Sequence, residues 1–525
     1  MKLSQAQLDH FARLVSQHPA QALKELQASE SIYADDPTFW FNYGGFLIDS
    51  GGVLHQKEVV ERGIGILQGM VPKAPNTVPP ILLYNLANGY MALYDLARQQ
   101  PEFHYDQDNQ ALLLAKRFYR EALVQPDRIA APLRSLIRVN YGNCLAQVGR
   151  SVEAIDIYDL ALLDVPDHAM ALGNLGLELL HYANVARDPS LLVNASDLLR
   201  EALTGANLEE TGLANARPTF ERTLGKVEER LTALGTMHTH TSNQKSPRRD
   251  SAYLRGYRAF CLQHHLFLNL CLRNRPCARP AGDTISLSLT TDLEDDTTFN
   301  RLSRVINEIK ERYAVSRLLL FEACDPPVAI QHIDELTQYT DNLDYAVYGI
   351  RVGKLKLAFE GAYNVLDKIA FFVNDYVALG VREEGVSFSR IWREGKGTSI
   401  RPTLLNLNNW YVFGLYDVSR DLAAGNYLNY LSKLRHISTH RYLVPHVETL
   451  AWRTEADAKE YHIGYHELLE KTIELMQLVR SSITYLIAFI DAEERRKRQN
   501  LSGQPIPMFM PLARPSPIGP QDTGV

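Results

Sequence analysis

The segment NYGNCLAQVGRSVEAIDIYDLALLDVP (residues 140–166) decides the fold of the N-terminal half of this 525-residue chain. Its small residues, Gly142, Ala154 and Ala161, recur among larger apolar side chains, and Pro166 follows the last of them. Small residues in this order let two antiparallel helices approach closely, and proline ends a helix because it cannot continue the hydrogen-bonding pattern. The segment therefore predicts a hairpin of two helices.

The same offsets recur along the chain and predict a repeat array. They match the tetratricopeptide repeat (TPR) pattern, and Gly176 follows Gly142 after one 34-residue period. Weaker units upstream contain Ala87 and Gly44. We expect N-terminal capping helices over residues 1–35, TPR-like repeats over 36–205, and a helix and linker over 206–250. A generic helical array is the alternative; either would bury a continuous core and leave a concave face for an unknown protein or peptide ligand.

Composition excludes several classes of protein. Lys and Arg number 55 against 61 Asp and Glu, for a net charge of −6, with 46% hydrophobic residues. This is the profile of a soluble globular protein, not of a disordered chain or of a dedicated duplex-binding domain. The N-terminus lacks an apolar leader, and the late apolar run at residues 483–490 is shorter than the ~20 residues that span a bilayer. We expect a cytoplasmic protein with no membrane contact.

The cysteines fit the same compartment. They are odd in number, form no CxxC pair and lie in a chain long enough to fold without disulfides, so we expect reduced thiols. They are Cys144, Cys261, Cys271, Cys277 and Cys324.

Residues 251–500 predict a second helical region. In VGKLKLAFEGAYNVLDKIAFFVNDYVALG (residues 352–380) apolar side chains recur at helical spacing, which predicts a buried bundle helix. These side chains are Leu355, Phe359, Ala362, Tyr363, Leu366, Ile369, Ala370 and Val373. Residues 281–298 break the pattern and predict a loop or a short hairpin, and the Pro-rich residues 501–525 predict a disordered tail. The fold class is therefore all-α, a helical-repeat solenoid followed by a helical bundle.

The residues that could carry chemistry centre on histidine. No Gly-rich phosphate loop, HExxH, GxSxG or CxxC pair is present, which removes most hydrolase and nucleotide-enzyme classes. In KLRHISTHRY (residues 433–442), Arg435 is followed by the polar His436 and, four residues later, by His440. The rival pairing in this half of the chain is Arg258 with the histidines at 264 and 265.

With AYNVLDKIAFFVNDY (residues 362–376) and the following FSRIW, this motif resembles the HEPN superfamily, in a bacterial subfamily often found behind TPR-like repeats. The resemblance implies a HEPN-like helical domain over residues 251–500 and a metal-independent endoribonuclease. Its catalytic residues would be Arg435, His440 and His436, the last at a position that is often Asn in the family. It also implies RNA as substrate, no cofactor, a homodimer through this domain, and the role of a regulated toxin or defence effector.

Elementary chemistry agrees with that reading. Cleavage of RNA by its own 2′-hydroxyl needs a general base, a general acid and a cation for the charge on phosphorus. Histidine, with an ordinary pKa of ~6.5, can take either proton role near neutrality. Arginine is a permanent forked phosphate ligand, and a helix C-terminus, which His440 approaches, favours positive charge. Five residues at ~100° each place Arg435 and His440 about 140° apart on an ideal helix, so a common site needs Arg435 to wrap around.

Two other readings concern the same region. His436 with His440, and His462 with His466, have the i, i+4 spacing of metal ligands on a helix. Since no HExxH motif or carboxylate repeat accompanies them, we expect no metal site. A non-catalytic scaffold that binds RNA, a nucleotide or another protein is the main alternative to an enzyme.

The loop RIWREGKGTSIRP (residues 390–402) combines cations with an aromatic residue, as single-strand binding surfaces do. We expect it to contact RNA, although a merely charged loop would have the same composition. The residues concerned are Arg390, Trp392, Arg393, Lys396 and Arg401.

Overall fold

The chain divides into two compact units. Unit 1 comprises Met1–Glu178 and Ala195–Glu228, and unit 2 comprises Leu179–Asn194 and Glu229–Val525. The computed structural model describes residues 1–71, 78–100, 110–205, 216–235, 251–273, 275, 282–290, 296–340, 344–395, 399–447, 459–500 and 507–509.

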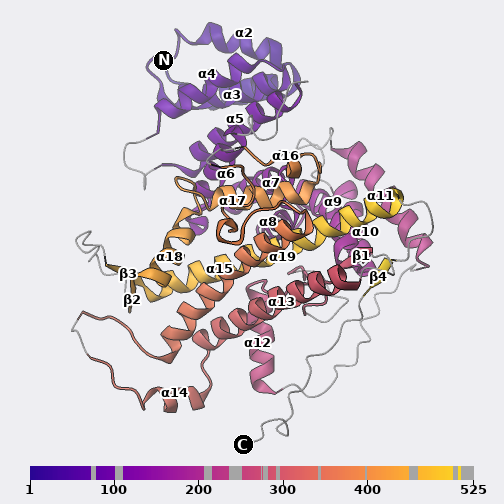
Figure 1. Ribbon diagram of the computed structural model, residues 1–525. Coiled ribbons are helices and arrows are strands. Elements are labelled where there is room, and N and C mark those ends of the chain that lie inside the picture. Colours follow the sequence, from indigo (N-terminus) through magenta and orange to yellow (C-terminus); the bar gives the residue numbers. More distant parts are fainter. Residues whose placement is uncertain are drawn as a thin grey trace, which may run out of the picture. The chain divides into compact units, whose positions relative to one another are not determined.

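Unit 1 is built from helical hairpins, in which a helix packs against the next along the chain (Figure 1). The first hairpin is α1 with α2, and α3 with α4, α5 with α6 and α7 with α8 follow. The bounds are α1 Gln5–Gln17, α2 Pro19–Ser29, α3 Pro37–Val53, α4 Lys57–Gly69, α5 Pro80–Arg98, α6 Gln110–Ala122, α7 Ala131–Gln147, α8 Ser151–Asp164, α9 Ala169–Ala186, α10 Pro189–Thr204 and α11 Arg217–Ala233. The division between the units falls within α9, α10 and α11. These hairpins are consistent with the predicted repeats.

The small residues of the repeat pattern lie where two helices touch. A Cβ atom added at Gly142 of α7 would lie 2.4 Å from a ring carbon of Tyr158 on α8. One added at Gly176 of α9 would lie 2.7 Å from Cγ of Leu199 on α10. Both distances are far below van der Waals contact. Glycine is thus required by the close approach of the paired helices, as the sequence pattern predicts.

Asparagine side chains connect successive hairpins of unit 1. The Asn140 amide of α7 donates to Asn88 Oδ1 of α5 at 3.2 Å, and the Asn174 amide of α9 donates to Asn143 Oδ1 at 2.7 Å. Such bonds between first helices fix the register in which one hairpin stacks on the next. At the end of α7, Gly149 takes a φ of 80° that glycine adopts without strain, and the chain turns there into α8.

Unit 2 is a bundle in which the long helices α13, α15 and α19 contact one another (Figure 1). Helix α17 packs on α19, and α18 packs on α15. The bounds are α12 Ala252–Gln263, α13 Asp296–Cys324, α14 Val328–Asp334, α15 Ile350–Tyr376, α16 Pro402–Leu405, α17 Trp410–Asp421, α18 Asn429–His440 and α19 Tyr465–Asn500. Every apolar position predicted to lie inside the bundle on α15 is buried. The predicted all-α fold class is confirmed.

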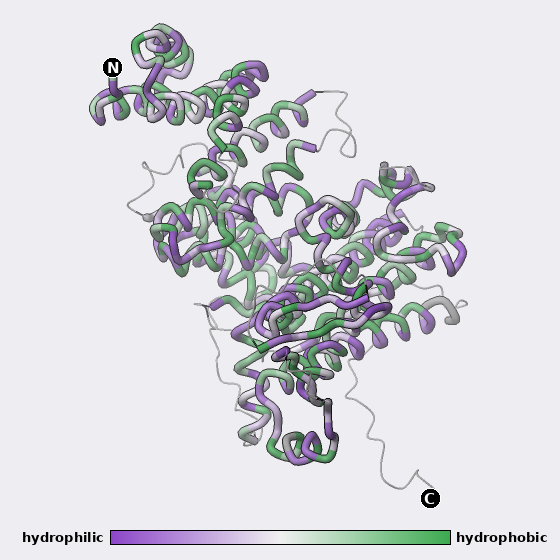
Figure 2. Tube along the Cα trace, turned by 90° about the vertical axis from the view of Figure 1, so that its left-hand side faces the viewer, coloured by the Kyte–Doolittle hydropathy of each residue, from purple (hydrophilic) through white to green (hydrophobic). Residues whose placement is uncertain are grey.

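Apolar and polar residues are interspersed along the helices (Figure 2). Helix α19 combines great length with a long apolar stretch. Among the described residues it alone is long and apolar enough to cross a membrane, yet 83% of its apolar window is buried inside the protein. Core helices of globular proteins pass the same test of length and composition.

Short strands interrupt the helical fold. Strand β1 (Ser288–Thr290) pairs antiparallel with β4 (Pro507–Phe509), and β2 (Tyr442–His446) pairs parallel with β3 (Glu460–Gly464). The expectation of a disordered tail is therefore wrong for residues 507–509, which pair with the segment predicted to be a loop or a short hairpin. Pairing between segments so distant in sequence has no local signal.

The cysteines depart from expectation at one position. Cys144, Cys261 and Cys324 are free, but Cys271 is disulfide-bonded. The prediction that all five are reduced is therefore wrong. Burial raises the pKa of Cys261 and of Cys324 to about 11, so both remain thiols near neutral pH.

Candidate active site

A polar stripe on α15 supports the helix that carries the Arg/His motif. Lys356, Glu360, Tyr363 and Asp367 follow one another at intervals of three or four residues, so they lie along one side of α15. Lys356 Nζ donates to the carbonyl of Leu443 at 2.7 Å. Burial lowers the pKa of Lys356 and raises that of Tyr363.

The rest of the stripe contacts α18 itself. Ser438 Oγ donates to Glu360 Oε1, and Tyr363 Oη lies 3.0 Å from Ser432 Oγ. These two contacts hold α18 against α15, and Lys356 reaches strand β2, which follows α18. The stripe therefore holds both α18 and the start of β2 in place.

Arg435 is held beside α15 without being fully hydrogen-bonded. Its guanidinium carbon lies 5.6 Å from the centre of the Tyr363 ring, within cation–π range. Its Nη2 lies 3.6 Å from Asp367 Oδ2, too far for a good hydrogen bond. The Nε atom is buried and has no hydrogen-bond partner among the described residues, and the side chain is 34% exposed. The guanidinium is thus positioned, and its exposed part, not the buried Nε, can donate to an anion.

Asp367 connects Arg435 to the segment that follows α15. While Oδ2 faces Arg435, Oδ1 accepts the backbone N–H of Phe388 at 2.9 Å. Phe388 is itself buried against Trp392, with ring centres 5.5 Å apart. The position of the motif arginine therefore depends on how residues 388–392 pack.

The two motif histidines lie together at the exposed end of α18. The rings of His436 and His440 are one turn apart, with centres separated by 5.0 Å. Both residues are exposed, and within the described part of the chain neither ring has a hydrogen-bond partner. His440 is in the last turn, where the helix carbonyls favour positive charge. The structure thus brings the histidines together on the solvent side, while Arg435 faces α15, as the ~140° separation on an ideal helix predicts.

The loop predicted to contact RNA is only partly suited to that task. Trp392 is wholly buried, and its Nε1 donates to the carbonyl of Phe388 at 2.6 Å, so the prediction that Trp392 contacts RNA is wrong. Arg401 Nε donates to the Ile391 carbonyl at 2.7 Å, which closes the loop from inside. Arg393 lies over the Tyr416 ring at 5.8 Å.

Arg390 is exposed and remains the plainest candidate for a phosphate contact in this loop. Lys396 lies outside the described residues. Of the predicted RNA-binding residues, one is therefore in the core, two are engaged with the protein and one faces solvent.

The rival histidines have other surroundings. His264 and His265 follow α12, and burial lowers the pKa of His264. His265 is buried and has a φ of 53°, and its carbonyl accepts from Arg480 Nη1 at 2.7 Å. This setting is structural. His462 lies in strand β3 and His466 in the first turn of helix α19, so their i, i+4 spacing does not place them on one helix face.

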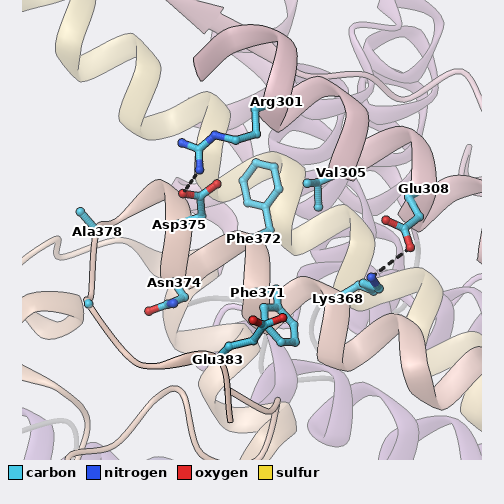
Figure 3. A pocket seen from close by; sticks show the side chains of 11 residues that line it. Arg301, Val305, Glu308, Lys368, Phe371, Phe372, Asn374, Asp375, Ala378 and Glu383 are labelled. Carbon is cyan, nitrogen blue, oxygen red and sulfur yellow. Dashed lines mark hydrogen bonds and ion pairs between the residues drawn. The ribbon is translucent and has the colours of Figure 1, made fainter. Parts of the chain in front are cut away.

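A cavity of about 740 Å³ lies on α15 one turn beyond the motif support, between α13 and residues 378–383. Phe371 and Phe372 form its apolar part, and two ion pairs border it, Arg301 with Asp375 and Lys368 with Glu308 (Figure 3). Hydrogen bonding to Lys368 and then Arg312 lowers the pKa of Glu308. The motif residues do not line this cavity. Sequence reasoning missed it because its walls are two ordinary helices, α13 and α15, and the short segment that follows α15.

Comparison with known proteins identifies the region that contains the motif. Residues 293–493 match the family described as LA2681-like HEPN. The match extends from α13 into α19 and includes Arg435, His436 and His440. No curated protein matches the chain. The predicted HEPN resemblance of the C-terminal half is therefore confirmed for these residues.

Proposed function

We propose that this chain, whose residues 293–493 form a HEPN domain, is a metal-independent endoribonuclease. The observation that carries the proposal is the end of α18, where a partly unsatisfied guanidinium and two exposed imidazoles lie on one short helix inside the matched region. These are the residue types that cleavage by the 2′-hydroxyl requires.

In the proposed reaction Arg435 binds the scissile phosphate through its free donors. The 2′-oxygen attacks phosphorus and the bond to the 5′-oxygen breaks. One imidazole accepts the 2′-proton, and a second, protonated imidazole gives its proton to the departing 5′-oxygen. The products are a 2′,3′-cyclic phosphate and a 5′-hydroxyl. His440 takes one of these roles, and His436 is the candidate for the other within the same chain.

We also propose that the working site is shared by two copies of the chain. Acid and base must act on opposite sides of the phosphorus, whereas His436 and His440 lie on the same side of one helix with ring centres 5.0 Å apart. A two-fold axis beside α18 would bring each motif near its own copy. Arginines from both chains would then repel each other unless an anion lay between them, which ties tight binding to phosphate.

The helical hairpins of unit 1 are proposed to bind a protein or peptide that controls cleavage. Stacked helix pairs expose an extended surface suited to a partner, and the role of a toxin or defence effector requires such control. The HEPN domain would then supply the chemistry and unit 1 the trigger.

The decisive experiment is incubation of the full-length protein with mixed RNA, with and without EDTA, beside His440→Ala. We expect cleavage that survives EDTA, leaves 2′,3′-cyclic phosphate ends and is lost in the variant. Activity lost on chelation and restored by one divalent ion would move the assignment to metal-dependent hydrolysis.

A non-catalytic RNA-binding scaffold is favoured by one observation, the proximity of Asp367, which partly neutralises Arg435. Asp367→Asn separates the readings because an amide oxygen can still accept the Phe388 N–H. If the protein is a nuclease, the rate of RNA cleavage by Asp367→Asn should differ from that of the wild type while the variant stays folded. For a scaffold, RNA should bind more tightly, with no cleavage by either protein.

A further inference from the structure

Two histidines from neighbouring strands meet away from the motif. His446 ends strand β2, and His462 lies in the middle of β3. In the parallel register Val444 lies opposite His462. His446 comes two residues after Val444 and therefore lies on the same face of the paired strands. His446 Nε2 is 2.8 Å from His462 Nδ1, and the ring centres are 5.1 Å apart.

In each ring, the protonation of the nitrogen that faces away from the other histidine decides whether the nitrogen between the rings has a free lone pair. His446 Nδ1 is 3.0 Å from the carbonyl oxygen of Asp344, and a carbonyl only accepts, so this nitrogen carries the proton. With Nδ1 protonated, His446 Nε2 has a lone pair directed at His462 Nδ1. His462 Nε2 lies 3.6 Å from Glu460 Oε2, so a carboxylate is near this ring without a hydrogen bond to it. A cation bound by His446 Nε2 and His462 Nδ1 would replace the hydrogen bond between the two rings.

We propose that His446 Nε2 and His462 Nδ1 bind a divalent transition-metal ion of the Zn²⁺ class. Imidazole nitrogens suit such ions, and metal-bound histidines usually donate the other ring N–H to a carbonyl or a carboxylate. At Zn–N distances of ~2.0–2.1 Å in tetrahedral geometry the nitrogens would lie roughly 3.3 Å apart, a small widening of the present gap. Among the described residues no group of three or more ligating side chains occurs, so the proposal names these two imidazoles as its protein ligands.

The motif histidines have no such carbonyl or carboxylate partner for a ring nitrogen among the described residues. His436 and His440 have the metal-ligand spacing, but among the described residues no acceptor orients either ring. His466, at the start of α19, is exposed and has only a ring contact with Tyr465. The pair between β2 and β3 is therefore the better ligand set.

The bound ion would fasten three chain segments together. Val347 N donates to the Pro445 carbonyl at 2.8 Å, so residues 344–347 already line the outer edge of β2. A metal between His446 and His462 would join this edge and β2 to β3. The ion's role is structural and separate from cleavage, for which no metal is proposed.

The test uses the full-length protein, stripped with EDTA, dialysed and titrated with Zn²⁺ in a calorimeter. The variants are His446→Gln and His462→Gln, with His466→Gln as the matched control. We expect the wild type and the control to bind one more equivalent of Zn²⁺ than either variant. Equal uptake by all four proteins, as a pair bridged only by a proton would give, overturns the proposal.

A second measurement needs no variant. Hydrogen exchange of the amides in residues 442–446 and 460–464 should slow when Zn²⁺ is added to the wild type, because the ion opposes local opening. Unchanged exchange in these strands, alongside Zn²⁺ uptake elsewhere, equally overturns the site. Neither readout depends on nuclease activity.

Discussion

Helices α15 and α18 pack against each other but differ in what their side chains do. The inner face of α15 is buried along its length, and its polar stripe holds α18 and the start of β2. The end of α18 instead leaves a guanidinium nitrogen and two imidazoles without hydrogen-bond partners in the described structure. Polar groups that give up such contacts contribute little to stability. The difference teaches that packing and chemistry are assigned to separate helices, so substitutions should separate the two properties.

The largest expected effect is on α15. Phe359 is buried among the bundle helices, and Phe359→Ala should lower the free energy of unfolding of the HEPN domain by about 3–5 kcal/mol, because it removes buried surface and leaves a cavity. Hydrogen exchange of the α15 amides measures this. Leu357→Ala is the matched control, since Leu357 is 57% exposed on the same helix. A similar loss in both variants would contradict the assignment of the inner face.

His440→Ala should show the opposite behaviour. Because His440 is exposed and has no hydrogen-bond partner in the described chain, its loss should change stability by no more than about 0.5 kcal/mol. Cleavage should fall by ~10²-fold or more, as expected when a proton-transfer group is removed. The measurement is the initial rate on RNA beside a thermal melt. His466→Ala, an exposed histidine outside the motif, should leave both unchanged.

The same contrast explains what sequence reasoning could predict. The buried face of α15 follows from a local apolar period, and Arg435, His436 and His440 follow from spacing within one helix. The supporting stripe at 356, 360, 363 and 367 borders the apolar face, and its Tyr363 belongs to both, so sequence could identify these positions. Their partner could not be identified, because a pattern on one helix does not say which other helix covers it.

Features that depend on distant contacts escaped prediction. Trp392 looked like a loop aromatic, but its indole N–H finds the Phe388 carbonyl inside the core. His462 looked like a helical residue, yet β3 pairs in parallel with β2, and parallel pairing has no hairpin turn to announce it. Tertiary packing decided these residues, and local composition could not report it.

A smaller effect tests whether the C-terminal end of a single α18 helix forms a complete active site. A mixed dimer of wild-type and His440→Ala chains, purified through two different tags, should keep about half the activity if each chain works alone. If the proposed shared site is correct, activity should fall several-fold below half, since each cleft then lacks one of its proton-transfer groups. This comparison requires that the mixed dimer and the wild-type dimer bind RNA equally well. A monomer in solution that cleaves at full rate would contradict the shared site.

The smallest effect is expected on the solvent side of α15, where Lys368 bonds Glu308 at 3.0 Å beside the cavity. This bond, together with Arg312, holds the pKa of Glu308 below its ordinary value. A lowered carboxyl pKa contributes stability above the ordinary pKa of 4.5, and that stability is lost as the pH falls through the lowered value.

Lys368→Met should therefore destabilise the domain at pH 7 but much less at pH 3. Since both side chains are more than one-third exposed, solvent screening limits the loss at pH 7 to about 1 kcal/mol or less. Urea unfolding at the two pH values measures the difference, and high salt should reduce it. An equal loss at both pH values would mean that the methylene stem of Lys368 stabilises α15 by packing. The buried side and the solvent side of this helix would then both stabilise the domain by packing and differ only in how much.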